Sequence, residues 1–142
     1  MRVEDIANVI AGQIMTRVTD EGADEDVVPI LVPKAINEGM IVREYLGKAV
    51  LAKPVDEERY TKEGDVVVKL STPYDAAYVT EDNVGLIVPS FCAIVRVKQE
   101  EKMNAKYLSA FFNTEFIRNQ LLSRVVGSLR PMIKITDIRS LE

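Results

Sequence analysis

The chain has 142 residues, of which 47% are hydrophobic and 28% charged, and its formal net charge is −4. This is the size of one ordinary domain with its own core. It contains no histidine and only one cysteine, which excludes Ser-His-Asp and Cys-His catalysis and leaves a zinc site without its usual ligands. No apolar run approaches the roughly 20 residues of a membrane span, the start is too acidic for a signal peptide, and a lone Cys92 suits a reducing compartment. We therefore expect a cytoplasmic protein with no membrane partner.

The first part of the chain predicts short strands separated by turns. Val3–Ile6 is expected to form a short helical entry, and a polar connector, residues 13–17, follows the first strand. Residues 20–26 hold five carboxylates and lack the ligand order of a calcium loop, so they predict a solvated loop. Gly47 is expected at a turn. The expected strands are residues 8–11, 27–32, 40–42, 49–52, 66–70, 77–80, 84–88 and 91–98.

The last part of the chain predicts two helices and a basic loop. Asn104 and Thr114 are expected to cap the two helices, and Gly127 to end the second. Apolar residues recur at helical spacing, which predicts that they pack mostly into a core; they are Leu108, Phe111, Phe112, Phe116, Ile117, Leu121, Leu122 and Val125. Residues 128–131 form a polar, basic corner, and residues 132–135 are expected to be extended. Strands followed by helices predict an α+β fold, a twisted, mostly antiparallel scaffold followed by a helix pair and a basic loop.

Positive charge is concentrated near the C-terminus. Residues 1–102 hold 12 basic and 19 acidic residues, a net charge of −7, whereas residues 103–142 hold 6 basic and 3 acidic residues, a net charge of +3. Arg124, Arg130 and Lys134 could converge near the end of the second helix, beside the backbone N–H groups and hydroxyl of residues 127–128. Such donors suit phosphate and base-edge contacts. A capped helix end with incidental cations explains the same residues equally well.

No catalytic, metal or cofactor motif is present in the sequence. It contains neither GxxxxGK[ST] nor GxGxxG, so no phosphate-cradling loop is indicated. Asp65 and Lys69 suggest a metal-dependent nuclease, but Val67 occupies the position of its usual second acid. An ordinary strand with exposed charged ends is the better interpretation of this stretch. Cys92, within an apolar run, is expected to be a small core residue.

Five segments, in order, resemble the target recognition domain of the specificity subunit of type I restriction–modification systems. They cover nearly the whole chain, and although each is a weak motif alone, their order and spacing are fairly specific. They are VEDIANVIAGQ, VPILVPKAINEGMI, YTKEGDVVVKL with its Gly64-Asp65 pair, AYVTEDNVGLIVPSFCAIVRV, and NAKYLSAFFNTEFIRNQLLSRVVGS with Tyr107, Leu108, Gly127 and Ser128.

The resemblance implies a non-catalytic module, without a cofactor of its own, that reads a short double-stranded DNA sequence. In the family, two such domains are joined by long helices that dock DNA methyltransferase subunits, and a nuclease-motor subunit can join the assembly. This chain corresponds to one such domain, residues 1–142. It stops where the family's proline-containing linker and long spacer helix would start, so no spacer helix is expected here.

The resemblance and the residue types together predict a DNA-facing surface made of three loops. The candidate contacts are Gln13, Thr16, Arg17, Thr72, Tyr74, Arg124, Ser128, Arg130 and Lys134. Gln can pair bidentately with adenine and Arg with guanine, whereas Arg124 and Lys134 are expected to hold phosphates. The alternative is a protein-interaction or regulatory domain that borrows this fold and binds a methyltransferase. The acidic majority favours it, because an acidic domain should bind duplex DNA weakly through phosphates alone.

Overall fold

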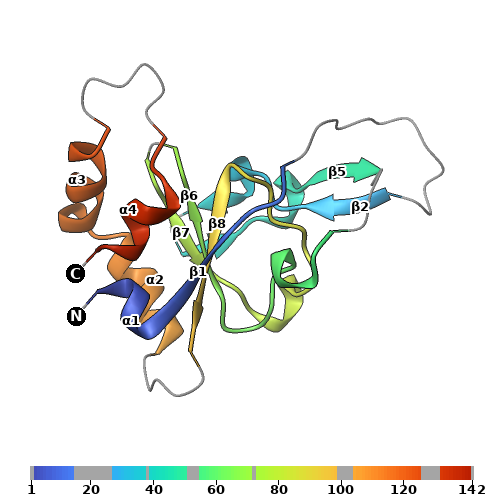
Figure 1. Cartoon of the computed structure of the whole chain (residues 1–142). Helices are drawn as coiled ribbons and strands as arrows, with labels where there is room; N and C mark the ends of the chain where they lie inside the picture. The colour runs from blue at the N-terminus through green and yellow to red at the C-terminus, as the bar shows by residue number, and fades with distance from the viewer. Residues whose placement is uncertain are drawn as a thin grey trace.

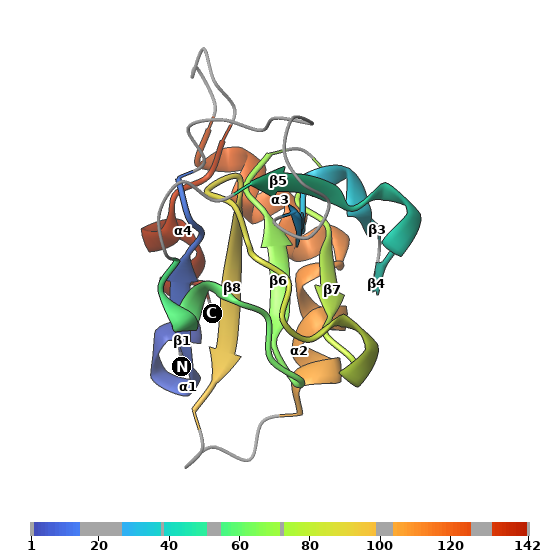
Figure 2. The same ribbon diagram turned by 90° about the vertical axis from the view of Figure 1, so that its right-hand side faces the viewer.

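A four-stranded antiparallel sheet forms the centre of the computed structural model, which describes residues 2–14, 27–37, 39–50, 55–71, 73–98, 104–125 and 132–141. The strands lie in the order β1 (Ala7–Ala11), β8 (Cys92–Val97), β6 (Val66–Lys69) and β7 (Ala76–Tyr78). They are seen side by side in Figure 2. The three valines of β6 are fully buried, because the sheet is covered on both faces. A short run of consecutive β-branched residues is typical of such a strand.

Helices cover one face of the sheet (Figure 1). They are α1 (Val3–Ile6), α2 (Ala105–Phe112), α3 (Glu115–Ser123) and α4 (Ile135–Arg139). Phe112, Ile117 and Ile138 are fully buried in one cluster with Val66 and Val68 of β6. Burying such a side chain contributes about 1.5–3 kcal/mol each, so this layer accounts for much of the core. Among the described residues, no helix has the length and apolarity needed to span a membrane.

Short strands and turns cover the other face of the sheet. Here Leu31, Ile36 and Ile41 pack against Val67 and Ile94, whose side chains point away from the helices. The paired strands of this layer are β2 (Val27–Ile30) with β5 (Gly47–Val50), and β3 (Ile36–Asn37) with β4 (Met40–Ile41). Its 3-10 helices are η2 (Pro33–Ala35), η3 (Arg43–Tyr45), η4 (Glu57–Arg59) and η5 (Glu81–Asn83). The β2–β5 ribbon extends beyond the sheet at the right of Figure 1.

The predicted α+β class and antiparallel scaffold are confirmed, and so are both helix caps. The side chain of Asn104 accepts a hydrogen bond from the Lys106 N–H at 2.8 Å, and that of Thr114 accepts one from the Ile117 N–H at 3.3 Å. Leu108 and Leu121 are buried as expected. Gly127 lies outside the described residues.

Some local predictions were wrong. Residues 84–88 form isolated bridges rather than a strand, since Gly85 has a φ of +86°. Gly47 begins β5 instead of marking a turn. The expected extended stretch 132–135 ends early because α4 begins at Ile135. The start of α4 is capped by the Asp137 carboxylate, which accepts a hydrogen bond from the Lys134 N–H at 2.8 Å.

Two side chains expected in the core are largely outside it. Phe116 and Leu122 are 69% and 40% exposed, although both are spaced like the buried residues of α3. The helices therefore bury a narrower stripe than their apolar residues suggested: Leu108, Phe112, Ile117 and Leu121 are buried in the core, and Phe111 and Val125 pack against it while partly exposed.

The outer edge of β7 is closed by a side chain. Asn113, between α2 and α3, accepts the Ala76 N–H at 2.8 Å through Oδ1 and donates to the Ala76 carbonyl at 2.9 Å through Nδ2. The amide thus occupies the place of a residue on a neighbouring strand. The Gly39 N–H also donates to the Ala76 carbonyl, at 2.7 Å. These contacts fix the helix pair to the sheet.

Replacing Asn113 with Ala should destabilise the domain by about 1–3 kcal/mol, because the Ala76 N–H would lose its partner near the core. Urea denaturation monitored by circular dichroism measures the change in the free energy of unfolding. Asn119→Ala is the matched control, since Asn119 is exposed on α3 and its replacement should cost little. Equal effects of the two substitutions would contradict the role given to Asn113.

Candidate nucleic-acid interface

Strand direction brings two of the three predicted DNA-facing loops to one end of the sheet. Strands β1 and β6 are each antiparallel to β8, so β1 and β6 run in the same direction and finish at the same end of the sheet. Ala11 at the end of β1 and Val68 near the end of β6 both align with Ala93 at the start of β8. The segments after β1 and after β6 therefore leave the sheet at the same end, on either side of the start of β8.

The third loop joins them through backbone contacts. An antiparallel bridge connects Ser71, which follows β6, with Met132, which follows the predicted basic corner. Next to this bridge the Ile133 N–H donates to the Leu70 carbonyl at 2.8 Å. The chain on the C-terminal side of the basic corner is thereby fixed beside the end of β6.

We call the backbone positions along this edge the strand-end row: Gln13, Ser90, Phe91, Ser71 and Met132. Hydrogen bonds hold its parts together, from the Ser90 N–H to the Gln13 carbonyl at 2.8 Å and from the Leu70 N–H to the Phe91 carbonyl at 3.1 Å. These backbone contacts therefore join described residues next to each of the three predicted loops at one end of the sheet.

Gly12 is required at the first position of this edge. A Cβ atom there would lie 1.9 Å from the Pro89 carbonyl oxygen, far inside contact distance. The close approach lets the Gln13 N–H donate to the Val88 carbonyl at 2.7 Å. The Gly12-Gln13 turn is thus fixed by a backbone contact with residues 88–90.

Two apolar side chains at this edge were missed by the sequence interpretation. Phe91, within the row, is 53% exposed, and Ile14, directly after Gln13, is 70% exposed. Phe91 was expected to begin a strand, but β8 begins at Cys92 and Phe91 lies in the preceding turn. The Pro-Ser sequence before Phe91 could have predicted a turn that exposes this residue, but the apolar run after Phe91 favoured its assignment to a strand. Exposed apolar side chains at such positions are able to contact thymine methyl groups or unstacked bases.

Arg124 and Lys134, the two described cations predicted to contact phosphates, differ in their contacts. Arg124 contacts Asp137 through Nη1 and Oδ1 at 3.8 Å, and donates to the Ser140 hydroxyl at 3.0 Å. Lys134 is exposed, and its backbone N–H is held by the same Asp137 carboxylate. Asp137 thus contacts the Arg124 side chain and the Lys134 backbone, while the predicted convergence of Arg124, Arg130 and Lys134 stays a prediction, because Arg130 lies outside the described residues.

Gln13 is held by a cation of the chain itself. Its side-chain oxygen accepts a hydrogen bond from Nη1 of Arg59 in η4 at 2.6 Å. The Gln13 amide is thereby oriented, and it retains an NH₂ group whose nearest partner is the Ile14 carbonyl at 3.3 Å. Thr16, Arg17, Thr72, Ser128 and Arg130, the other predicted contacts, lie outside the described residues.

Tyr74 requires a correction, because its side chain is fully buried. It belongs to the core cluster on the helix side of the sheet, together with Phe112 and Ile117. Its backbone has a φ of +61°, and its N–H donates to the Ser71 carbonyl at 2.8 Å, so a tight turn directs the ring inward. Burial also raises the pKa of the phenol. A buried ring is not available to DNA, and Tyr74 is removed from the candidate contacts.

The loop after β6 is anchored by a partly buried ionic network. The Asp75 carboxylate accepts a hydrogen bond from Nη2 of Arg118 at 2.6 Å and lies 3.7 Å from Nζ of Lys69. All three side chains are at most 20% exposed. The network links the end of β6, the start of β7 and helix α3, so it fixes the positions of residues 69 and 75 relative to the helices.

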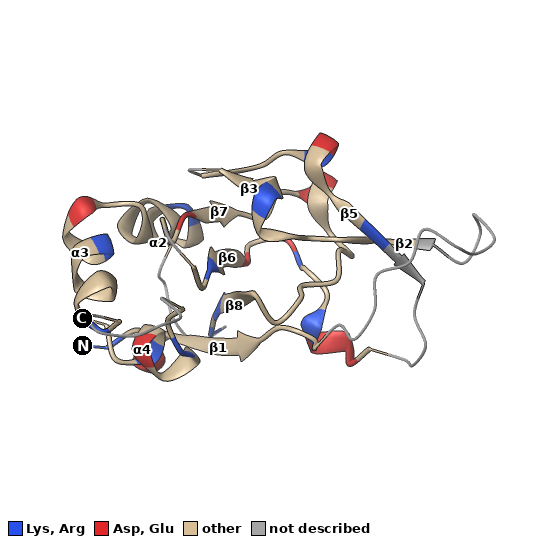
Figure 3. Cartoon of the chain, turned by 90° about the horizontal axis from the view of Figure 1, so that it is seen from above, with Lys and Arg blue, Asp and Glu red and all other residues tan. Residues whose placement is uncertain are grey.

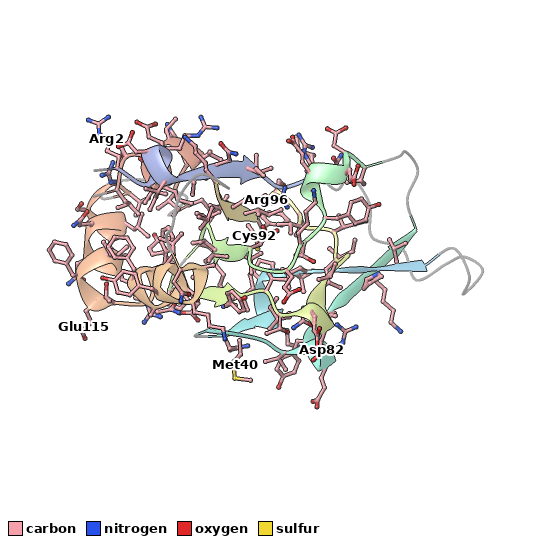
Figure 4. The ribbon with its side chains drawn as sticks, turned by 90° about the horizontal axis from the view of Figure 1, so that it is seen from below. Arg2, Met40, Asp82, Cys92, Arg96 and Glu115 are labelled. Carbon is pink, nitrogen blue, oxygen red and sulfur yellow. The ribbon has the colours of Figure 1, made fainter. Side chains whose placement is uncertain are left out.

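The expectation that Asp65 and Lys69 are exposed strand ends was wrong. Asp65 is 1% exposed and forms two hydrogen bonds with Arg96 of β8, from Nε at 2.9 Å and from Nη2 at 2.8 Å. The hydrogen bond with Asp65 raises the pKa of Arg96, against the opposing effect of burial. Arg96 lies inside the fold in Figure 4, unlike Arg2 at its outline. The Asp-Val-x-x-Lys stretch is therefore engaged in ion pairs that hold the sheet.

Cys92 is a core residue, as predicted. Burial raises the pKa of its thiol to about 12, although the nearby Lys69 cation acts in the opposite direction. Such a thiol remains protonated and unreactive at neutral pH. Within the described residues there is also no group of three or more Cys, Asp or Glu side chains arranged to hold a metal ion.

Comparisons with known proteins identify the fold. No protein-family model and no curated protein matches the chain. A solved structure described as the "structural basis underlying complex assembly and conformational transition of the type I R-M system" matches with a TM-score of 0.71 and 20% identity, covering 99% of this chain and 35% of that one. The HsdS subunit from Thermoanaerobacter tengcongensis matches with a TM-score of 0.67 and 18% identity, covering 99% and 35%. The resemblance inferred from the sequence is confirmed at the level of the fold, and the chain spans about a third of the length of these chains.

Replacing Asp75 with Ala should cost about 3 kcal/mol or more of unfolding free energy, because Lys69 and Arg118 would be left partly buried without their carboxylate. Thermal and urea denaturation measure the loss. Asp82→Ala is the control, since the Asp82 side chain is exposed in η5 and labelled at the outline of Figure 4. A change at Asp75 no larger than that at Asp82 would show that the network contributes little.

Proposed function

We propose that this chain is a sequence-specific recognition module for double-stranded DNA in a type I restriction–modification system. It would act in the cytoplasm and direct methylation and restriction by partner subunits, without catalysing either reaction itself. The observation that supports the proposal is the strand-end row, in which described residues that flank the three predicted loops lie at one end of the sheet. The shared fold with the type I R-M structure and the HsdS subunit supports it.

In this proposal, different side chains at the row contact different parts of the DNA. The NH₂ group of Gln13 and the side chain of Arg130 are suited to base edges in the major groove, and Lys134 to a phosphate. Phe91 and Ile14 are suited to thymine methyl groups or an opened base step. The remaining candidate contacts from the same loops are Thr16, Arg17, Thr72 and Ser128. Arg124 is a weaker candidate for a phosphate contact, because it already forms an ion pair with Asp137.

The net charge of −4 means that the isolated domain should bind DNA weakly. A DNA methyltransferase subunit would supply most of the phosphate contacts, and a restriction subunit could join the complex. The acidic balance also favours a second candidate function, a protein-interaction domain that binds a methyltransferase instead of DNA. The two candidates differ in whether the purified domain binds duplex DNA at all.

A salt titration separates these functions. Fluorescence anisotropy with labelled random-sequence duplex should show binding at low salt, with log K falling linearly as log salt rises. The slope counts released counterions, so it also estimates the number of phosphate contacts. No binding at low salt, together with co-purification of a methyltransferase, would support the protein-interaction function instead.

Two cation substitutions should have different consequences for DNA binding. Arg130→Ala should cost about 1–3 kcal/mol on the preferred sequence and relax the preference, as expected for a base contact. Lys134→Ala should weaken all sequences about equally and lower the salt slope by about 1, as expected for a phosphate contact. Binding across a library of duplex variants measures both. Unchanged selectivity of the Arg130 variant would remove that residue from the base contacts.

A further inference from the structure

The outer edge of β1 is open, in contrast to that of β7. The Lys98 N–H donates to the Ile6 carbonyl at 2.9 Å, and alternation along an antiparallel ladder then turns the backbone groups of Ala7, Val9 and Ala11 away from β8. The Ala7 N–H is used by the Val3 carbonyl, in the cap of α1. β1 is the end strand of the sheet, so these outward groups face the margin of the fold (Figure 3).

One side chain touches this edge but does not close it. Arg139 of α4 donates from Nη2 to the Val9 carbonyl at 3.3 Å, a long contact from an exposed residue. On the opposite edge of the sheet, Asn113 satisfies both the N–H and the carbonyl of Ala76. Among the described residues, the outward N–H groups of Val9 and Ala11 and the carbonyls of Ala7 and Ala11 have no such partner. An unpaired strand edge of this kind is a template for another strand.

The edge is recessed in a groove. A cavity of about 510 Å³ follows β1 and is lined by Glu4, residues 7–11, Glu58, Arg59 and Arg139. Helix α4 borders it on one side of the sheet and η4 on the other, and α4 lies next to β1 in Figure 3. A groove with walls on both sides admits a single extended segment but obstructs the flat edge of another folded sheet. The geometry resembles the general mode in which a peptide adds a strand between a sheet edge and a neighbouring element.

The charges of the groove indicate which segment fits. Arg59 and Arg139 both line the groove. Nη1 of Arg59 donates to Gln13, and among the described residues the Arg139 guanidinium makes only its long contact with Val9. Glu4, at the other end, is 3.6 Å from Arg2 and so partly neutralised. The remaining acid, Glu58, is exposed. Two guanidinium groups thus face the space in which the side chains of an added strand would lie, which favours carboxylates on that strand.

We propose that the β1 groove binds an extended, acidic segment of a partner protein as a fifth strand of the sheet. A segment of about five residues would match the length of β1 and pair with its outward N–H and carbonyl groups. Its carboxylates would pair with Arg59 and Arg139, and Arg139 would release the Val9 carbonyl to the ladder. The proposal concerns the margin of the sheet and is distinct from the proposed DNA contacts, although Arg59 also donates a hydrogen bond to Gln13 of the strand-end row.

Three labelled pentapeptides test this directly by fluorescence anisotropy with the whole chain. The acetylated, amidated peptide Val-Asp-Asp-Asp-Val has carboxylates on both faces of a strand, and it should bind with an affinity about ten-fold above that of Val-Lys-Lys-Lys-Val, because charge-assisted hydrogen bonds are lost in the second. A version of the first peptide that is N-methylated at every residue should also lose binding, since it has no N–H group with which to pair with a strand edge. Equal binding of all three peptides, or none by any of them, would overturn the proposal.

A matched pair of variants separates strand addition from general damage. Ala11→Pro removes an outward N–H of the exposed Ala11 while leaving the β1–β8 ladder intact, and should abolish peptide binding. Ala11→Val keeps the N–H and should bind as the parent does. Circular dichroism and a urea titration check that both variants are folded. Retained binding by a folded Ala11→Pro variant would contradict pairing at the β1 edge.

Discussion

The burial of β6 and β8 on both faces constrains the rest of the structure. Their alternate side chains point into two separate clusters, so the sheet must be covered by helices on one face and by short strands and turns on the other. A strand pair enclosed in this way can carry function only at its ends and margins. The ion pair between Asp65 and Arg96, and that between Asp75 and Arg118, lie at these ends and hold the segments that leave the sheet. The strand-end row and the open edge of β1 are consequences of the same arrangement.

The elements with a strong local signal were predictable from the sequence. The valines of β6, the caps at Asn104 and Thr114, and the buried positions Leu108, Phe112, Ile117 and Leu121 follow from short-range preferences, whereas Phe116 and Leu122 share that spacing but are exposed. The start of α4 was missed because its Asp137 cap is a single contact within a stretch that otherwise favours an extended chain. Burial of Tyr74 and pairing of Asp65 could not be predicted, since both depend on partners distant in the chain. The sequence showed these residues as polar or aromatic groups in a loop or at a strand end, without showing which way they point.

The candidate site, too, was predictable only in part from the sequence. The sequence indicated which loops carry donors, but only the direction of β1 and β6 and the bridge between Ser71 and Met132 brought the described parts of those loops together. The structure also showed that available cations are fewer than the charge count suggests. Arg59 donates a hydrogen bond to Gln13, and Arg118 and Arg124 form ion pairs with Asp75 and Asp137. A domain with so much of its positive charge engaged is suited to reading base edges while partner subunits bind the backbone, which agrees with the modest role that phosphate contacts have in the proposed function.

Hydrogen exchange with and without duplex DNA tests the central claim most directly, that the strand-end row is the DNA-facing surface. At low salt, with the whole chain and an excess of duplex, we expect slower amide exchange in the peptides that contain Ile14, Phe91 and Lys134. Peptides at the opposite end of the sheet, around Lys98 and Asn104, should exchange at unchanged rates. Protection at that opposite end, with none along the row, would contradict the account.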